Sequence, residues 1–129
     1  MLDASAAVEL LLGTPLGDEV AVRLAADGGP AHAPHLFDVE VMSAVRRGVT
    51  RGIVGATRGG EAIEDLADLA VVRHPHRPLL PRMWTLRDRL SPYDAAYVAL
   101  AEQLGAPLLT RDARLARAGG HGAAIELIG

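Results

Sequence analysis

Short apolar segments alternate with helical segments along the chain, and this alternation limits the fold more than any other feature of the sequence. Segments with strand character begin near residues 1, 30, 70, 107 and 123, and stretches with helical spacing of apolar residues separate them. Parallel strands need such crossovers between them. The pattern therefore predicts an α/β fold with a mainly parallel, five-stranded sheet covered on both faces. The length of 129 residues fits one domain spanning residues 1–129.

Capping signals and apolar spacing place the expected elements. Strands are expected over residues 1–3, 30–33, 70–73, 107–110 and 123–128. Helices are expected over residues 5–12, 17–27, 36–51, 61–69, 79–90, 92–104 and 112–118. Ser91-Pro92-Tyr93-Asp94 is typical of a helix start, with a serine cap, a proline at the first position and an acid at the third. The buried stripe of that helix is expected to consist of Tyr93, Tyr97, Leu100 and Leu104.

Composition excludes several kinds of chemistry. All 13 basic residues are arginine, and the chain has neither lysine nor cysteine. It therefore has no Walker-type phosphate lysine, no Schiff base, no thiol nucleophile and no thiolate zinc site. Only 3% of the residues are aromatic, so the core is expected to consist of Ala, Val, Leu and Ile.

The chain shows no sign of a membrane span or a secretory signal. Its longest obvious apolar run, residues 95–101, is much shorter than the roughly 20 residues that cross a bilayer. No basic residue precedes Arg23, so a basic signal-peptide region is missing. We expect a cytoplasmic protein. The net charge of -3 argues against a general basic surface for nucleic acids, although local arginine clusters can still meet phosphates.

Acidic residues fall at the junctions between strands and helices. Asp3 and Asp112 follow expected strands, Asp94 lies at a helix start, and Glu40 lies in the first turns of the helix after the second strand. Ligands of such sheets bind beyond the carboxyl ends of the strands, so these acids are expected to lie together. Each alone is also explained as a helix cap or a first-turn acid. Together they cannot all stay ionised without a cation, because like charges raise one another's pKa.

Clustered carboxylates suit Mg²⁺ or Mn²⁺ rather than zinc. Such a cluster can hydrolyse a phosphodiester, because the metal generates a hydroxide, orients it in line and stabilises the leaving oxygen. We therefore take Asp3, Glu40, Asp94 and Asp112 as candidate catalytic and metal-binding residues. Ser5 and Thr110 each lie two residues from a proposed ligand and are candidates to orient it, with capping or strand-end bonding equally open.

The chain resembles the PIN-domain ribonucleases, in particular the VapC-type toxins of bacterial toxin-antitoxin pairs. The resembling stretches are residues 2–6, 33–41, 90–101 and 107–116, in the family's order and spacing. The most specific part is the helix sequence Tyr-Asp-Ala-Ala-Tyr-Val-Ala-Leu-Ala, followed by Leu-Thr-x-Asp-x-x-Leu. The family usually has a few more apolar residues before its first aspartate, so either the start of the chain was assigned late or the first strand is short.

The resemblance implies a three-layer α/β/α sandwich and an endoribonuclease that depends on Mg²⁺ or Mn²⁺. The family's metal-binding acids fall on Asp3, Glu40, Asp94 and Asp112. The implied partners are an RNA substrate, a small cognate antitoxin and a second copy of the chain. The antitoxin of such a pair often binds DNA, and we expect no direct DNA binding by this chain and no membrane partner.

Several other side chains have two open interpretations. Arg46, Arg47 and Arg51 lie one to three turns beyond Glu40, where they can line a path for RNA or simply form a solvated face. Trp84 is expected to pack in the core or in a dimer interface. Surface or turn positions are expected for the five histidines, His32, His35, His74, His76 and His121.

Two other functions fit part of the pattern. One is a PIN-like module that binds RNA or a protein without cutting, but such a module has no physical reason to keep four mutually repelling carboxylates. The other is a phosphotransfer enzyme or receiver with Asp3 as the acceptor. Such families typically need a lysine near the phosphoryl oxygens, and this chain has none.

Overall fold

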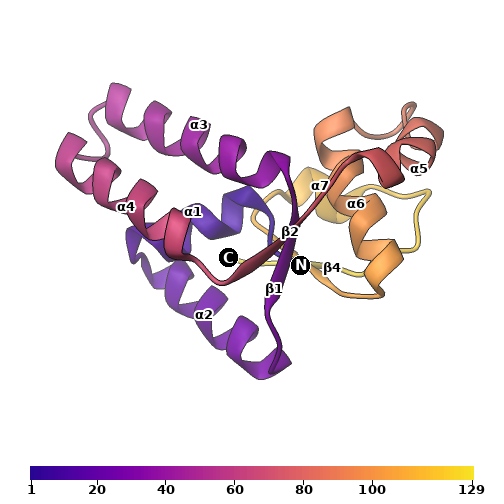
Figure 1. The fold of residues 1–129 in the computed structure, drawn as a ribbon, viewed down its shortest axis with the longest axis horizontal. Helices are drawn as coiled ribbons and strands as arrows, with labels where there is room; N and C mark the ends of the chain where they lie inside the picture. Colours follow the sequence, from indigo (N-terminus) through magenta and orange to yellow (C-terminus); the bar gives the residue numbers. More distant parts are fainter.

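A computed structural model describes all 129 residues and places short strands between two groups of helices (Figure 1). The strands are β1 (Ala31–Pro34), β2 (Val71–His74), β3 (Leu108–Thr110) and β4 (Ile125–Leu127). On one side lie α1 (Ala4–Leu12), α2 (Pro15–Asp27), α3 (Leu36–Thr50) and α4 (Ala56–Asp68). On the other side lie the 3-10 helix η1 (Arg77–Leu79), α5 (Leu80–Thr85), α6 (Pro92–Leu104) and α7 (Ala113–Arg117). The α/β class is confirmed.

The strands pair in parallel, but the sheet is less continuous than expected. β1 pairs with β2 and β3 pairs with β4, which gives two two-stranded sheets. The first residues of the chain lie between them, because Leu2 forms an isolated parallel bridge with Leu109 and donates its amide to the His32 carbonyl at 3.0 Å. The segment before Asp3 therefore forms an isolated bridge rather than a ladder.

Two of the expected helices were wrong in extent. The helix expected over residues 61–69 begins earlier, at Ala56, and contains Gly59 and Gly60. Gly59 has a packing role there, because a Cβ atom at this position would lie 2.7 Å from the Val49 Cγ2 atom of α3. The helix expected over residues 79–90 is only the 3-10 turn η1 followed by α5, which ends at Thr85.

The core is aliphatic, as the composition predicted, with Phe37 and Tyr97 as its only aromatic side chains. Every residue of α6 from 95 to 101 is buried, so the middle of this helix has no solvent face. The expected stripe is wrong at its ends, because Tyr93 is 62% exposed and Leu104 is 37% exposed where the helix projects beyond its neighbours. Trp84 does not pack in the core, since it is 69% exposed.

Two histidines expected in turns belong to strands instead. His32 lies in β1 and His74 in β2, and the two imidazole rings meet with 2.9 Å between Nδ1 of His32 and Nε2 of His74. A third ring fixes the start of α3, because His76 Nε2 accepts the Leu36 amide at 2.9 Å. These rings are therefore parts of the β1–β2 packing. No helix is both long enough and apolar enough to cross a membrane.

Gly17 sets how closely α1 and α2 approach. A Cβ atom at this position would lie 2.2 Å from the backbone oxygen of Glu9, so the backbone itself has to shift. We expect Gly17→Ala to lower the free energy of unfolding by about 1–3 kcal/mol, the usual cost of overpacking. Gly60→Ala is the matched control, because nothing lies within 4 Å of a Cβ atom there. The control is expected to raise stability by up to about 1 kcal/mol through helix propensity. Urea denaturation compares the two variants, and equal stabilities would contradict the packing argument.

Candidate active site

The structure brings the four acidic residues chosen from the sequence into one cavity of about 440 Å³. Asp3 follows the bridge residue Leu2, and Asp112 follows β3 and precedes α7. Glu40 comes from α3, and Asp94 from the first turn of α6. Segments far apart in the sequence therefore meet beyond the strand ends, as expected for a ligand site in a parallel α/β fold.

Two hydroxyl groups fix the carboxylate of Asp3. Ser5 Oγ donates to Asp3 Oδ2 at 2.6 Å, and Thr110 Oγ1 donates to the same oxygen at 2.7 Å. The two hydroxyls lie 3.3 Å apart. Asp3 makes no capping bond to α1, although it stands at the capping position and is only 9% exposed. A buried carboxylate held on one oxygen has its other oxygen, Oδ1, available to a ligand.

Glu40 is the least satisfied of the four acids. Its Oε1 atom is buried without a hydrogen-bond partner, and so is the nearby Tyr97 hydroxyl. Burial, together with the charges of Asp3 and Asp94, raises the pKa of Glu40, although the Tyr97 hydroxyl acts in the opposite direction. Within the chain the Tyr97 hydroxyl is the polar group that acts on this carboxyl, and a cation bound beside the buried oxygen would stabilise its charged form further.

Asp94 and Asp112 differ in their surroundings. Burial and the charges of Asp3 and Asp112 raise the pKa of Asp94. The Asp112 carboxylate caps α7 by accepting the Arg114 amide at 2.8 Å, and it also pairs with the Arg114 side chain at 3.0 Å. Burial acts to raise the pKa of Asp112, but these bonds from Arg114 outweigh it and lower that pKa. The capping interpretation therefore holds for Asp112, which is the acid already neutralised within the chain.

No group of three acidic or histidine side chains is drawn together tightly enough to hold a metal ion as it stands. The chemistry of the donor set nevertheless fits a hard divalent cation. All four candidates offer carboxylate oxygens, and one of them has a buried oxygen without a partner. Two of them, Glu40 and Asp94, have pKa values raised by burial and by the charges of neighbouring acids, Asp3 among them. A bound Mg²⁺ or Mn²⁺ would relieve both conditions.

Sequence reasoning missed three charged residues of the cavity wall. Arg111, Arg114 and Glu9 line it together with the acids. Arg111 forms an ion pair with Glu9 across the cavity. The arginines flank Asp112 in the Thr-Arg-Asp-Ala-Arg sequence, and that adjacency was the available signal.

Of the three arginines expected along α3, only Arg47 lines the cavity. Its Nη1 atom donates to the Ser43 hydroxyl at 3.0 Å. Arg46 and Arg51 are exposed and do not line the cavity. Arg51 caps the C-terminus of α3, and it is 11 positions from Glu40, about 16 Å along a helix axis. Contact of these arginines with RNA stays a prediction.

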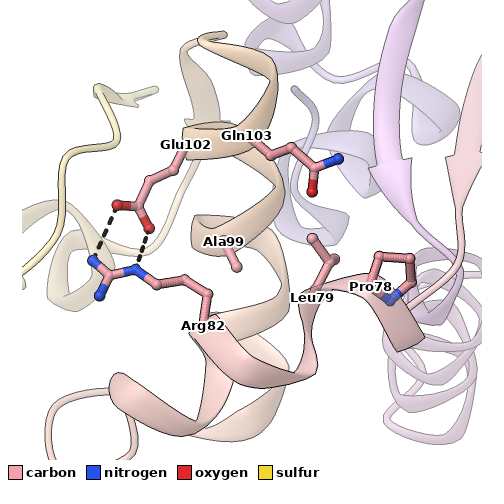
Figure 2. Close-up of a pocket in the computed structure, with 6 residues that line it drawn as sticks. All are labelled: Pro78, Leu79, Arg82, Ala99, Glu102 and Gln103. Carbon is pink, nitrogen blue, oxygen red and sulfur yellow. Dashed lines mark hydrogen bonds and ion pairs between the residues drawn. The ribbon is translucent and has the colours of Figure 1, made fainter.

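A second hollow, of about 320 Å³, lies between η1, α5 and α6 (Figure 2). Its charged side chains, Arg82 and Glu102, pair with each other at 2.9 Å and 3.0 Å, as the dashed lines in Figure 2 show. Arg82 accordingly lowers the pKa of Glu102. Because its two charged side chains pair with each other, this hollow offers no free charge, and the acidic cavity is the candidate active site.

Known proteins are similar to this chain over nearly its whole length. The PIN domain family model matches residues 1–121. Ribonuclease VapC12 of Mycobacterium tuberculosis is 48% identical over 128 residues, covering 99% of this chain and 98% of the relative. VapC ribonuclease Mb0985 of Mycobacterium bovis is 44% identical over 119 residues, covering 92% and 90%. Ribonuclease VapC1 of Mycobacterium tuberculosis is 39% identical over 129 residues, covering 99% and 96%. The similarity extends over nearly the full length of each relative.

Proposed function

This chain belongs to the PIN-domain family, and from that premise we propose that it is a metal-dependent endoribonuclease of the VapC type, the toxin of a toxin-antitoxin pair. Its relatives are named as VapC ribonucleases over nearly their whole length. The observation that carries the proposal for the site is the convergence of Asp3, Glu40, Asp94 and Asp112 on one cavity, with a buried Glu40 oxygen that lacks a partner.

The proposed roles follow from the geometry. Asp3, Glu40 and Asp94 would hold Mg²⁺ or Mn²⁺, with Asp112 at the edge of the same site. A bound ion of this kind supplies a nucleophilic water at neutral pH and offsets charge on the phosphate that is cut. Ser5 and Thr110 orient the Asp3 carboxylate through their hydroxyl bonds to Oδ2. Arg47 and Arg111 lie on the wall, where they meet an entering phosphate backbone.

The partners follow from the same proposal. RNA is the substrate, a small antitoxin is the inhibitor, and the chain itself does not bind DNA. We also propose a homodimer, supported by the exposed apolar side chains of Leu80, Trp84 and Tyr93, which are 52%, 69% and 62% exposed. A cytoplasmic location is consistent with an RNA substrate. The bonds of Leu2 to both neighbouring strands support residues 1–3 as the middle strand of a five-stranded sheet.

A PIN-like module that binds RNA or a protein without cutting is the alternative. A binding module has no need for a buried Glu40 oxygen without a partner beside a second acid whose pKa is raised. Incubation of the purified protein with a panel of structured RNAs, with Mn²⁺, with Mg²⁺ and with EDTA, separates the two. Cleavage that requires the metal supports the nuclease, and intact RNA under all conditions supports the binding module.

Ser5→Ala tests the arrangement around Asp3. This substitution removes one of the two hydroxyl bonds to Asp3 Oδ2 and leaves the carboxylate itself in place. We expect the Mn²⁺ concentration needed for half-maximal cleavage to rise roughly 10- to 100-fold, as is usual when a group that orients a metal ligand is lost. Thr57→Ala, which removes a hydroxyl from the exposed side of α4, is the control. The same metal requirement in both variants would show that Ser5 is only a structural residue.

A further inference from the structure

A smaller hollow adjoins the acidic cavity and shares Asp94 and Arg114 with it. It has a volume of about 310 Å³, and its floor is formed by the buried side chains of Leu90 and Leu115. Two polar groups that the proposed reaction does not use, Arg89 and Ser91, complete its wall. The two hollows are therefore neighbouring compartments, with Asp94 and Arg114 on the boundary between them.

The Arg89 side chain packs against a loop, but its guanidinium has no acidic partner. Its aliphatic stem passes under the backbone of Gly120, where a Cβ atom would lie 2.5 Å from Arg89 Cδ and Nε. Gly120 has a φ of +83°, so the loop approaches this closely only because the residue has no side chain. The Arg89 guanidinium makes neither an ion pair nor a hydrogen bond, whereas Arg114 pairs with Asp112. Arg89 thus offers five free N–H donors to a ligand.

Ser91 lines the same hollow and is engaged with Asp94. Its Oγ atom accepts the Asp94 amide at 3.2 Å in the N-terminal cap of α6. The Ser91 hydroxyl also bonds to the Asp94 side chain, which acts to lower the pKa of Asp94. The guanidinium of Arg89 is therefore the one group of this hollow without an acceptor, and a free guanidinium favours an anionic ligand with several oxygens.

The acidic cavity has Arg47 and Arg111 on its wall, and Arg89 adds a cation beyond that wall. In that cavity bound cations would offset the carboxylates and the phosphate that is cut, but they act on the neighbouring phosphates only at a distance. A nucleic acid strand carries a charge at every nucleotide, and cationic side chains that neutralise it supply most of the affinity. Because the adjoining hollow shares Asp94 and Arg114 with the acidic cavity, a strand that enters the cavity would have a neighbouring phosphate within reach of Arg89.

We propose that the hollow formed by Arg89, Ser91 and Arg114 binds the backbone phosphate next to the one that is cut. This inference rests on the proposed nuclease function and specifies how its substrate is held. Arg89 is then a substrate-binding residue, and the RNA strand runs from the acidic cavity across the start of α6 toward Gly120.

The first test compares Arg89→Gln with Arg117→Gln, which removes the same charge from an exposed position of α7 outside both hollows. Both are made in chains carrying Asp3→Asn, so that bound RNA stays intact, and binding of a fluorescent single-stranded RNA is measured in Mg²⁺ at several salt concentrations. Arg89→Gln is expected to weaken binding roughly 5-fold relative to the control, the upper range for an exposed ion pair. It should also reduce the slope of log affinity against log salt by about 0.7, the value for one phosphate contact on a single strand.

The second test uses the active chain and an RNA with one mapped cleavage bond. Replacing a single adjacent phosphate by an uncharged methylphosphonate is expected to raise KM roughly 5-fold for the wild type but not for Arg89→Gln, with kcat unchanged in both. Equal effects of the two arginine substitutions, or no coupling at either adjacent phosphate, would overturn the proposal. In that case the hollow would be a surface for an acidic protein segment.

The two proposals fail in different ways. A wild-type chain that cuts no RNA in Mn²⁺ or Mg²⁺ refutes the nuclease, while the binding comparison of Arg89→Gln with Arg117→Gln still decides whether Arg89 meets a phosphate. Thermal melting of both variants serves as the check on folding, because neither side chain forms an ion pair whose loss would destabilise the chain.

Discussion

Asp94→Asn is expected to lower the rate of RNA cleavage in Mn²⁺ by more than about 100-fold, since losing even a group that orients a metal ligand costs 10- to 100-fold. The substitution replaces one carboxylate oxygen by an amide nitrogen, which cannot ligate a hard cation, and it leaves the size of the side chain unchanged. Asp94 lies on the first turn of α6, whose next seven residues are buried, so the backbone at this position is firmly placed. The measurement is the single-turnover rate on an RNA that the wild type cuts.

Asp88→Asn is the matched control. It also changes an aspartate to asparagine, six positions earlier in the chain. Asp88 lies on an exposed segment and lines neither hollow. The control is expected to cut RNA at the wild-type rate. If the Asp94 and Asp88 variants retain the same activity, Asp94 is not part of the metal site.

Metal binding is expected to stabilise the wild-type chain markedly. A ligand at 100 times its dissociation constant adds about 2.7 kcal/mol to the free energy of unfolding. For a chain of this length that corresponds to a rise in Tm of about 10 °C. Differential scanning fluorimetry with and without Mn²⁺ measures the shift, and Asp3→Asn and Asp94→Asn are expected to lose most of it. A wild-type Tm that does not change with Mn²⁺ would contradict a metal site built from these acids.

Without metal, Asp94→Asn is expected to raise the Tm rather than lower it. Burial raises the pKa values of Asp94 and Glu40, so the folded chain binds their protons more strongly than the unfolded chain does. Their contribution to stability is therefore fully favourable only below the unfolded pKa values and is lost as the pH rises through the folded ones. In EDTA at pH 7, Asp94→Asn is expected to melt at a higher temperature than the wild type, and the difference should shrink as the pH falls toward 4.

The candidate site residues could be predicted from the sequence because helix-capping signals and strand ends mark the positions of these acids. Asp3 and Asp112 directly follow strand residues, and Ser91 with Pro92 marks the first turn that carries Asp94. These are local signals, so they are readable without knowledge of the packing. Their roles as metal ligands and the contacts of Arg46 and Arg51 with RNA stay predictions.

Tertiary packing explains what could not be predicted. Gly59 and Gly60 are typical of a break, yet α4 continues through them because α3 packs so closely that only glycine fits at position 59. The ion pair between Arg111 and Glu9 joins residues 102 positions apart, so no local sequence pattern predicts it. The extent of the sheet depends on which backbone groups the segment before Asp3 bonds to. The apolar character of that segment alone does not specify this pairing.

The complete burial of α6 from residue 95 to 101 has an evolutionary consequence. A helix with no solvent face has no side on which substitutions accumulate freely, because each enlargement overpacks a neighbour and each truncation opens a void. Substitutions are expected to accumulate at exposed positions instead, and Arg47, Arg89 and Arg111 are among them. Under the proposed function, exchange of such exposed arginines would change the RNA preference while the buried helix beneath them stays the same.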